Sequence, residues 1–490
     1  MGRSLWGLGL VLAAGMAAAA PRTDIVVGMQ LEPPHLDPTA GAAAAIDEVT
    51  YANVFEGLTR FGPEGQVLPG LAESWSVAPD GLSWEFTLRE GVTFHDGTPF
   101  TAEDVVFSFE RAMADESTNA QKALFAGINS VNVIEDTAVE IGLDAPKATL
   151  LSNLAWGDAA IVSPASADGN KTHPVGTGPF KFSNWIQGDR IELVKNPDYW
   201  GEPAKLDKVT FKFISDPTAA YAAMMAGDLD AYPVFPAPEN LAQFAADPRF
   251  SVIVGTTEGE TILAMNNARP PFNDIRVREA VAHAIDRKAI IDGAMFGYGT
   301  PIGSHFPPHN AAYEDLTALS AYDPAKSKAL LAEAGYPDGF ETTLTLPPPS
   351  YARRGGEIVA AQLRAVGIVS RIVNVEWAQW LEQVFKNKDF GLSIVSHTEP
   401  MDIEIYARDD YYFGYHDPVM KSLIWGLDRL PEQADRDEVL RAAQERIASR
   451  YVNGFLFQLP KTGVADARIE GLWVNAPTQA DDMTAVHWQE

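Results

Sequence analysis

The segment from Tyr51 to Arg111 constrains the fold of this chain more than any other part of the sequence. It reads YANVFEGLTRFGPEGQVLPGLAESWSVAPDGLSWEFTLREGVTFHDGTPFTAEDVVFSFER. These residues predict, in order, a turn, an amphipathic strand, a tight His-Asp-Gly turn and a capped helix. None of these elements carries a catalytic pattern, so we interpret the segment as scaffold.

Two local patterns within this segment are especially clear. Trp84, Phe86 and Leu88 alternate with polar residues, which predicts a strand with one buried face. Thr101 and Asp104 have the spacing of a capping box and mark the start of a helix.

Aspartate, proline and glycine mark further helices along the chain. Asp216-Pro217 and Asp323-Pro324 are each suited to open a helix, and Gly227 and Gly335 are suited to close one. Apolar residues at helical spacing predict one helix over 274–291. The remaining predicted elements are a helix over 357–366 and strands over 25–29, 191–195, 209–214, 368–375 and 391–395. This alternation of strands and helices indicates an α/β protein.

The first twenty residues differ from the rest of the chain. Arg3 is their only charge, Leu5 to Ala20 is apolar and small, and the alanines before Pro21 offer a cleavage site. Residues 1–20 are therefore predicted to be a signal peptide cleaved near Ala19 or Ala20. The alternative is a membrane anchor, but the apolar run is shorter than the ~20 residues that a spanning helix needs.

The chain contains no cysteine. An exported protein without cysteine has no disulfides and depends on its core for stability. It also lacks the residue that carries the lipid of a bacterial lipoprotein. We therefore expect a soluble, non-lipidated protein of the bacterial periplasm.

Length and charge limit the organisation and the partners of the protein. A chain of 490 residues exceeds one ordinary core, which favours two or more lobes. Its formal charge is −29, and losing Arg3 with the leader makes it −30. Such a surface repels nucleic acids and anionic lipids, so neither is expected as a partner.

Several motifs, in a fixed order, resemble those of a known family. The resemblance is to the extracytoplasmic solute-binding proteins of peptide and nickel ATP-binding-cassette importers, family 5, which include dipeptide- and oligopeptide-binding proteins. It spans roughly residues 25 to 470. The motifs include Leu71-Ala72-Glu73-Ser74-Trp75, Phe94-His95-Asp96-Gly97, Val175-Gly176-Thr177-Gly178-Pro179-Phe180, Lys195-Asn196-Pro197-Asp198-Tyr199-Trp200 and Pro271-Phe272-Asn273-Asp274.

The resemblance implies a two-lobed periplasmic-binding-protein fold of type II, with an extra subdomain and central mixed sheets flanked by helices. Lobe I is expected over 21–265 plus about 465–490, with the subdomain inserted at about 60–175, and lobe II over 266–464. Two chain crossings would form a hinge. The implied protein is a monomer that encloses a solute and delivers it to importer permease subunits in the inner membrane.

No catalytic motif is found, and the chain is not expected to be an enzyme. The sequence has no G-x-S-x-G elbow, no H-E-x-x-H zinc pair and no phosphate-binding Walker loop. His95-Asp96 could be a base with its orienting group, but the Asp96-Gly97 pair is more typical of a scaffold turn. No cofactor or metal is expected, because the nine histidines form no obvious cluster in the sequence.

Polar residues after the strand predicted over 391–395 are candidates for ligand binding. In the peptide-binding members this strand end supplies a Trp and then an Asp for the peptide amino group. The corresponding positions here are Val395 and about Thr398, which argues against dipeptide capture. His397, Glu399 and Asp402 could instead pair with an ammonium group or with sugar hydroxyls. The alternative is a surface loop with solvated charges.

Four further residues complete the candidate site. Arg353 and Arg354 follow Tyr351 in a region where peptide binders place an arginine against the ligand carboxylate, which suits the planar guanidinium. They could equally lie at an exposed helix start. Trp377 is a candidate apolar wall, although its spacing from Trp380 also fits a helix packed on a core.

The predicted function is capture of a small solute, with a short peptide as the family default. A saccharide, a polyol, an amine metabolite or a metal chelate is the alternative cargo, and a binding module without an importer is an alternative role. A more distant alternative is a secreted glycoside hydrolase that uses Glu399 and Asp402 as paired carboxylates.

Overall fold

The computed structural model describes residues 22–489 except 42, 399–401, 428 and 431–432. The predicted signal peptide, residues 1–20, lies outside this part of the chain. Within the described residues, no helix combines the length and the apolar character that a membrane crossing requires.

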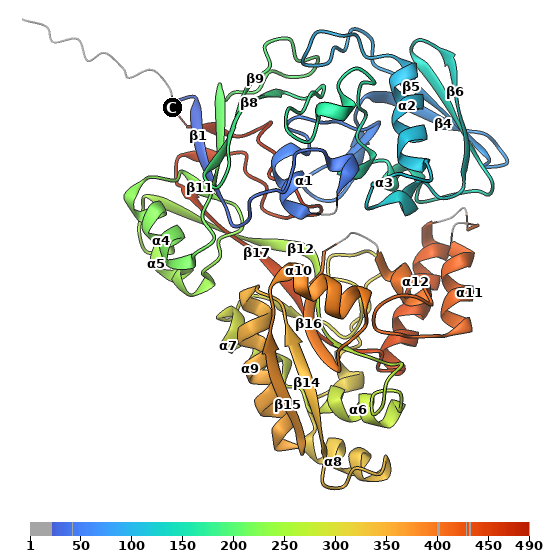
Figure 1. Ribbon diagram of the computed structural model, residues 1–490, viewed down its shortest axis with the longest axis vertical. Coiled ribbons are helices and arrows are strands. Elements are labelled where there is room, and N and C mark those ends of the chain that lie inside the picture. The colour runs from blue at the N-terminus through green and yellow to red at the C-terminus, as the bar shows by residue number, and fades with distance from the viewer. Residues whose placement is uncertain (1–21, 42, 399–401, 428, 431–432, 490) are drawn as a thin grey trace, which may run out of the picture.

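Two lobes are joined by two long antiparallel strands, β12 (Phe250–Met265) and β17 (Asn453–Asp466) (Figure 1). Their pairing shifts register between Thr256 and Glu260. Such an irregularity bends a strand and increases its twist locally. Both strands belong to an eleven-stranded mixed sheet of order β15-β14-β16-β12-β17-β11-β1-β10-β9-β8, with β13 (Thr300–Pro301) paired to β17.

The N-terminal lobe holds one end of this sheet. Its core includes Val27, Phe180 and Phe211, and it also takes in Ala465 and Trp488 from the end of the chain. The chain thus returns to its first lobe after β17. The strands are β1 (Asp24–Met29), β8 (Phe180–Ile186), β9 (Arg190–Lys195), β10 (Lys208–Phe213) and β11 (Ala231–Tyr232), followed near the C-terminus by β18 (Ile469–Glu470) and β19 (His487–Trp488). The helices are α1 (Ala44–Thr50), α4 (Pro217–Ala226) and α5 (Leu241–Ala245).

A separate four-stranded sheet, of order β4-β5-β7-β6, forms a smaller unit with its own core. Phe86 and Leu88 are buried in that core, as their alternation predicts. The capping box is also present, since the amide of Thr101 donates to Asp104 at 2.8 Å. The elements of this region are β2 (Thr59–Phe61), β3 (Val67–Pro69), β4 (Ala72–Val77), β5 (Ser83–Leu88), α2 (Ala102–Met113), β6 (Ile128–Glu135), β7 (Ala138–Leu143) and α3 (Leu150–Asn153).

The C-terminal lobe contains three strands in parallel, with β14 between β15 and β16. Helices α6 to α9 share its main core with these strands, and α11 and α12 contribute to a second core. The elements are α6 (Ile275–His283), α7 (Arg287–Met295), α8 (Pro324–Glu333), β14 (Phe340–Leu346), α9 (Ser350–Ala365), β15 (Ile368–Asn374), α10 (Trp377–Trp380), β16 (Leu392–His397), α11 (Pro418–Leu427) and α12 (Gln433–Ser449). The residue boundaries predicted for the two lobes stay predictions.

Two predicted helices were wrong in extent. The single helix expected over 274–291 is two helices, because Asp286 accepts a hydrogen bond from the Ala289 amide and caps α7 as a new helix. The helix expected from residue 357 begins at Ser350 instead. Two glycines, Gly355 and Gly356, obscured this earlier start. At Gly356 the helix packs so closely that a Cβ would come within 2.3 Å of the Leu346 side chain.

Replacing the N-cap Asp323 with alanine is expected to destabilise the protein by about 1 kcal/mol. Its carboxylate accepts a hydrogen bond from the Lys326 amide at 2.9 Å, which alanine cannot replace. Chemical denaturation measures the change. The exposed Lys328 of the same helix, replaced with alanine, is the control and should cost less than about 0.5 kcal/mol. Equal losses in the two variants would contradict the capping role.

Candidate ligand-binding site

The predicted binding residues gather at the carboxyl ends of three parallel strands. Strand β14 pairs in parallel with both β15 and β16, so the three strands end at the same edge. Helices α9 and α10 begin there, and α10 lies at the end of the lower sheet that faces the upper lobe (Figure 1). In open α/β sheets, ligands bind outside the carboxyl ends of the strands.

Tyr351 contacts the residue next to His397 at this edge. Tyr351 is in the first turn of α9, and its hydroxyl accepts a hydrogen bond at 3.1 Å from the amide of Ser396. His397 is the last residue of β16 and is buried. The candidate residues of α9 and β16 are therefore held by a direct contact between the two elements.

Asp402 pairs with His397 and with a histidine that the sequence analysis did not single out. His305 Nε2 lies 2.7 Å from one oxygen of Asp402, and His397 Nδ1 lies 3.5 Å from the other. Burial alone would raise the pKa of Asp402. The charge and hydrogen bond of His305, together with those of His397, outweigh that effect and hold the pKa below its usual value. The carboxylate is thus stabilised in its ionised form.

Tyrosines surround this group of side chains. The hydroxyl of Tyr412 lies 3.2 Å from His397 Nε2, and that of Tyr411 lies 3.4 Å from His397 Nδ1. The hydroxyl of Tyr406 lies 3.1 Å from His305 Nδ1. The aromatic stretch 409–416 therefore contributes both to the core of the C-terminal lobe and to the candidate site.

Arg354 forms an ion pair between the lobes. Its guanidinium donates two hydrogen bonds, at 2.6 and 3.0 Å, to the carboxylate of Glu239, which lies just before α5 in the N-terminal lobe. This bond also lowers the pKa of Glu239. Arg353 instead contacts the Val375 carbonyl and the Glu376 carboxylate, each at 3.3 Å. Both arginines are therefore engaged within the protein, and their predicted role toward a ligand carboxylate stays a prediction.

The remaining candidates lie along the same edge. Trp377 opens α10, is 40% exposed and stacks on the buried Trp380 with ring centroids 5.2 Å apart. Thr398, just after β16, accepts a hydrogen bond at 2.6 Å from Gln479 of the C-terminal segment. Glu399 lies outside the described residues.

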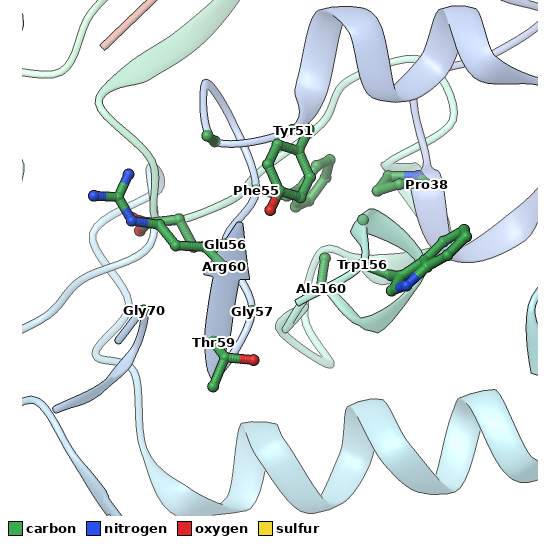
Figure 2. Close-up of a pocket in the computed structure, with 12 residues that line it drawn as sticks. Pro38, Tyr51, Phe55, Glu56, Gly57, Thr59, Arg60, Gly70, Trp156 and Ala160 are labelled. Atoms are coloured by element: carbon green, nitrogen blue, oxygen red, sulfur yellow. The ribbon is translucent and has the colours of Figure 1, made fainter. Parts of the chain in front are cut away.

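A small pocket in the N-terminal lobe is a different feature. Figure 2 shows it between the Tyr51, Phe55 and Trp156 side chains, and its volume is about 20 Å³. A cavity of this size holds a water molecule but not a solute. The nearby Glu56 carboxylate already accepts hydrogen bonds, including one from Trp200 at 2.9 Å.

The turn predicted at His95-Asp96 is present in the structure. The Asp96 carboxylate accepts a hydrogen bond from the Thr98 amide at 2.9 Å, and Gly97 has a φ of 87°. His95 contacts the Gly178 carbonyl at 2.9 Å, and burial lowers the pKa of its imidazole to about 4. The turn therefore forms as predicted, and its role as scaffold stays a prediction.

Comparison with known proteins identifies the family. Residues 66–408 match the family model described as bacterial extracellular solute-binding proteins, family 5, middle. The chain belongs to this family. The predicted family and the two-lobed periplasmic-binding-protein fold are confirmed, and the chain is a solute-binding protein.

Curated relatives and a solved structure agree with this assignment. Heme-binding protein A of Haemophilus influenzae is 34% identical over 64% of this chain and 62% of its own length. Glutathione-binding protein GsiB of Salmonella typhi is 33% identical over 77% of this chain and 75% of its own. The periplasmic binding protein DppA of Helicobacter pylori, solved with the peptide STSA, matches with a TM-score of 0.85 at 25% identity and covers 96% of this chain and 99% of its own. All three are named as binding proteins.

Proposed function

We propose that this protein is the receptor of an ABC importer and that it captures a small solute between its two lobes by hinge closure. The observation that carries the proposal is the convergence of Tyr351, His397 and Asp402 at the carboxyl edge of β14–β16. Contacts to the solute from both lobes would favour the closed form, which the importer recognises.

The link between the lobes fits such a motion. Among the strands that the structure describes, β12 and β17 run the full way between the sheet halves, and their pairing is irregular near Thr256. Two side-chain contacts also join the lobes. They are the Arg354–Glu239 ion pair and the hydrogen bond from Gln479 to Thr398. We infer that they bias the open–closed equilibrium, which needs ~5.5 kcal/mol of differential binding to shift from 1:99 to 99:1.

We further propose a periplasmic location after removal of residues 1–20, and a monomeric receptor that meets permease subunits in the inner membrane. The relatives support a cargo of metabolite size, because DppA was solved with a peptide and GsiB is named for glutathione. A short peptide or peptide-like solute is therefore the first class to test.

Native mass spectrometry of protein purified gently from its own periplasm tests the proposal, since a closed receptor retains its solute. We expect a protein complex heavier than the mature chain by the mass of one small molecule. Recovery of the bare chain alone, together with no heat of binding when a periplasmic small-molecule extract is added, would contradict the receptor role.

A further inference from the structure

Three side chains with metal-ligating atoms converge at the candidate site from separate segments of the chain. They are His305, which follows β13, His397 at the end of β16, and Asp402, which opens the short helix Asp402–Ala407. One donor atom from each lies within 4.8 Å of the others. Two imidazoles and one carboxylate form a donor set that suits borderline transition metals such as Zn²⁺.

The two imidazoles are oriented toward one point. His305 Nε2 faces one oxygen of Asp402 at 2.7 Å, and His397 Nδ1 faces the other at 3.5 Å. An ion placed among these atoms would take one lone pair from each ring and one or two from the carboxylate. The separations are short enough that small side-chain adjustments bring all three groups to coordination distance.

The opposite nitrogen of each imidazole also has a partner, as in known metal sites. His305 Nδ1 lies 3.1 Å from the hydroxyl of Tyr406, and His397 Nε2 lies 3.2 Å from that of Tyr412. A metal-ligating histidine almost always donates its second N–H to an oxygen, which fixes the ring orientation. The tyrosines occupy those positions for both rings.

A nearby buried carboxylate and the partial exposure of Asp402 also favour binding of a cation at this site. Glu260 of β12 is directly opposite His397 of β16, so their side chains lie on the same face of the sheet, and Glu260 is only 3% exposed. A second buried carboxylate therefore lies on the same face of the sheet as His397. Asp402 retains 13% exposure of its side chain, whereas His305 is fully buried, so an ion would enter past Asp402.

We propose that His305, His397 and Asp402 bind one divalent transition-metal ion of the zinc type, and that donor atoms of the solute complete its coordination. Three protein ligands leave at least one position of a four-coordinate ion open to a solute. The cargo class is then a metal chelate, such as a metal-bound peptide or amino acid. This cargo class rests on the receptor role proposed above, whereas the metal site itself does not.

Isothermal titration of the chelator-treated mature protein with Zn²⁺ alone tests the site. We expect one ion per chain in the wild type. His397→Gln and Asp402→Asn should each weaken binding at least about 10-fold, and Tyr412→Phe, which removes the oxygen beside His397 Nε2, should weaken it about 10-fold.

His416→Gln is the matched control. His416 also contacts an aspartate, Asp409, at 3.0 Å, but both side chains are more than half exposed. We expect its Zn²⁺ affinity to equal that of the wild type. Equal affinities in all variants, or loss in His416→Gln alone, would overturn the proposal, as would the absence of stoichiometric binding to the wild type.

Spectroscopy of the wild-type protein tests the same site without relying on variants, which could fail to fold. Co²⁺ added to the wild type should give the visible absorption of a low-coordinate ion with nitrogen ligands, and X-ray absorption should show two imidazoles. A spectrum of hexaaquo Co²⁺ would contradict the site. That outcome would leave the receptor role standing, because solute retention is measured separately by mass spectrometry.

Discussion

Replacing Lys461 with methionine is expected to lower the free energy of unfolding by about 3 kcal/mol at pH 8, the upper part of the range for removing one partner of a buried hydrogen bond. Lys461 lies on β17 and is 2% exposed, and its ammonium group donates to the Trp473 carbonyl at 2.9 Å. The charges of Asp481 in the C-terminal segment and of Glu48 in α1 act on it. Removing the cation leaves these two carboxyls without their compensating charge.

The loss of stability caused by Lys461→Met should be larger at pH 8 than at pH 5. Burial, followed by the charge of Asp481, raises the pKa of Glu48 to about 8, and burial raises that of Asp481 to about 6. Between the unfolded and folded pKa values the native state holds more protons than the unfolded state, so the contribution of these groups to stability falls as pH rises from about 4 to 8. At pH 5 both carboxyls are largely protonated, and Lys461→Met should cost less than at pH 8.

Denaturant unfolding at pH 5 and pH 8 measures both effects. Lys288→Met is the control, because the Lys288 side chain is 79% exposed, and it should change stability by less than about 0.5 kcal/mol at either pH. An identical loss at both pH values for Lys461→Met would show that the cation is not balancing these carboxyls.

Replacing Gly176 with alanine is expected to destabilise the protein by about 3 kcal/mol, the upper part of the range for overpacking. A Cβ at Gly176 would come within 1.9 Å of the Val54 carbonyl oxygen. That obstacle is backbone, and the same oxygen accepts a hydrogen bond from the Gly178 amide at 3.0 Å, so it cannot move away without breaking a second contact.

Gly169→Ala is the matched control for this substitution. It lies in the same lobe, and a Cβ there would meet no atom within 4 Å. Thermal unfolding should therefore show a clear fall in melting temperature for Gly176→Ala and almost none for Gly169→Ala. Similar melting temperatures for the two variants would contradict the close packing of the Gly176 segment on Val54.

Local signals explain why much of the scaffold was predictable. The capping box at Thr101 and the turn at Asp96 involve residues two or three positions apart, and both form as expected. The break between α6 and α7 was missed because the buried Ile285 continues the apolar pattern across it. The periodicity of apolar residues does not show that Asp286 starts a new helix.

The candidate site was only partly predictable because its contacts are distant in sequence. His305 and Asp402 are 97 residues apart, and neither neighbouring segment carries a metal-binding motif. The Arg354–Glu239 pair likewise spans 115 residues and two lobes. Such pairs depend on the path of β12 and β17 and on the order of strands in the sheet. The sequence around each paired residue does not indicate this long-range arrangement.

Small-angle X-ray scattering tests most directly whether the two lobes close around a solute. The mature protein would be measured alone and then saturated with the solute that native mass spectrometry identifies, with calorimetry confirming one bound molecule per chain. We predict that the radius of gyration falls on saturation, because rotation about β12 and β17 brings the lobes together. An unchanged radius of gyration at full occupancy would contradict hinge closure.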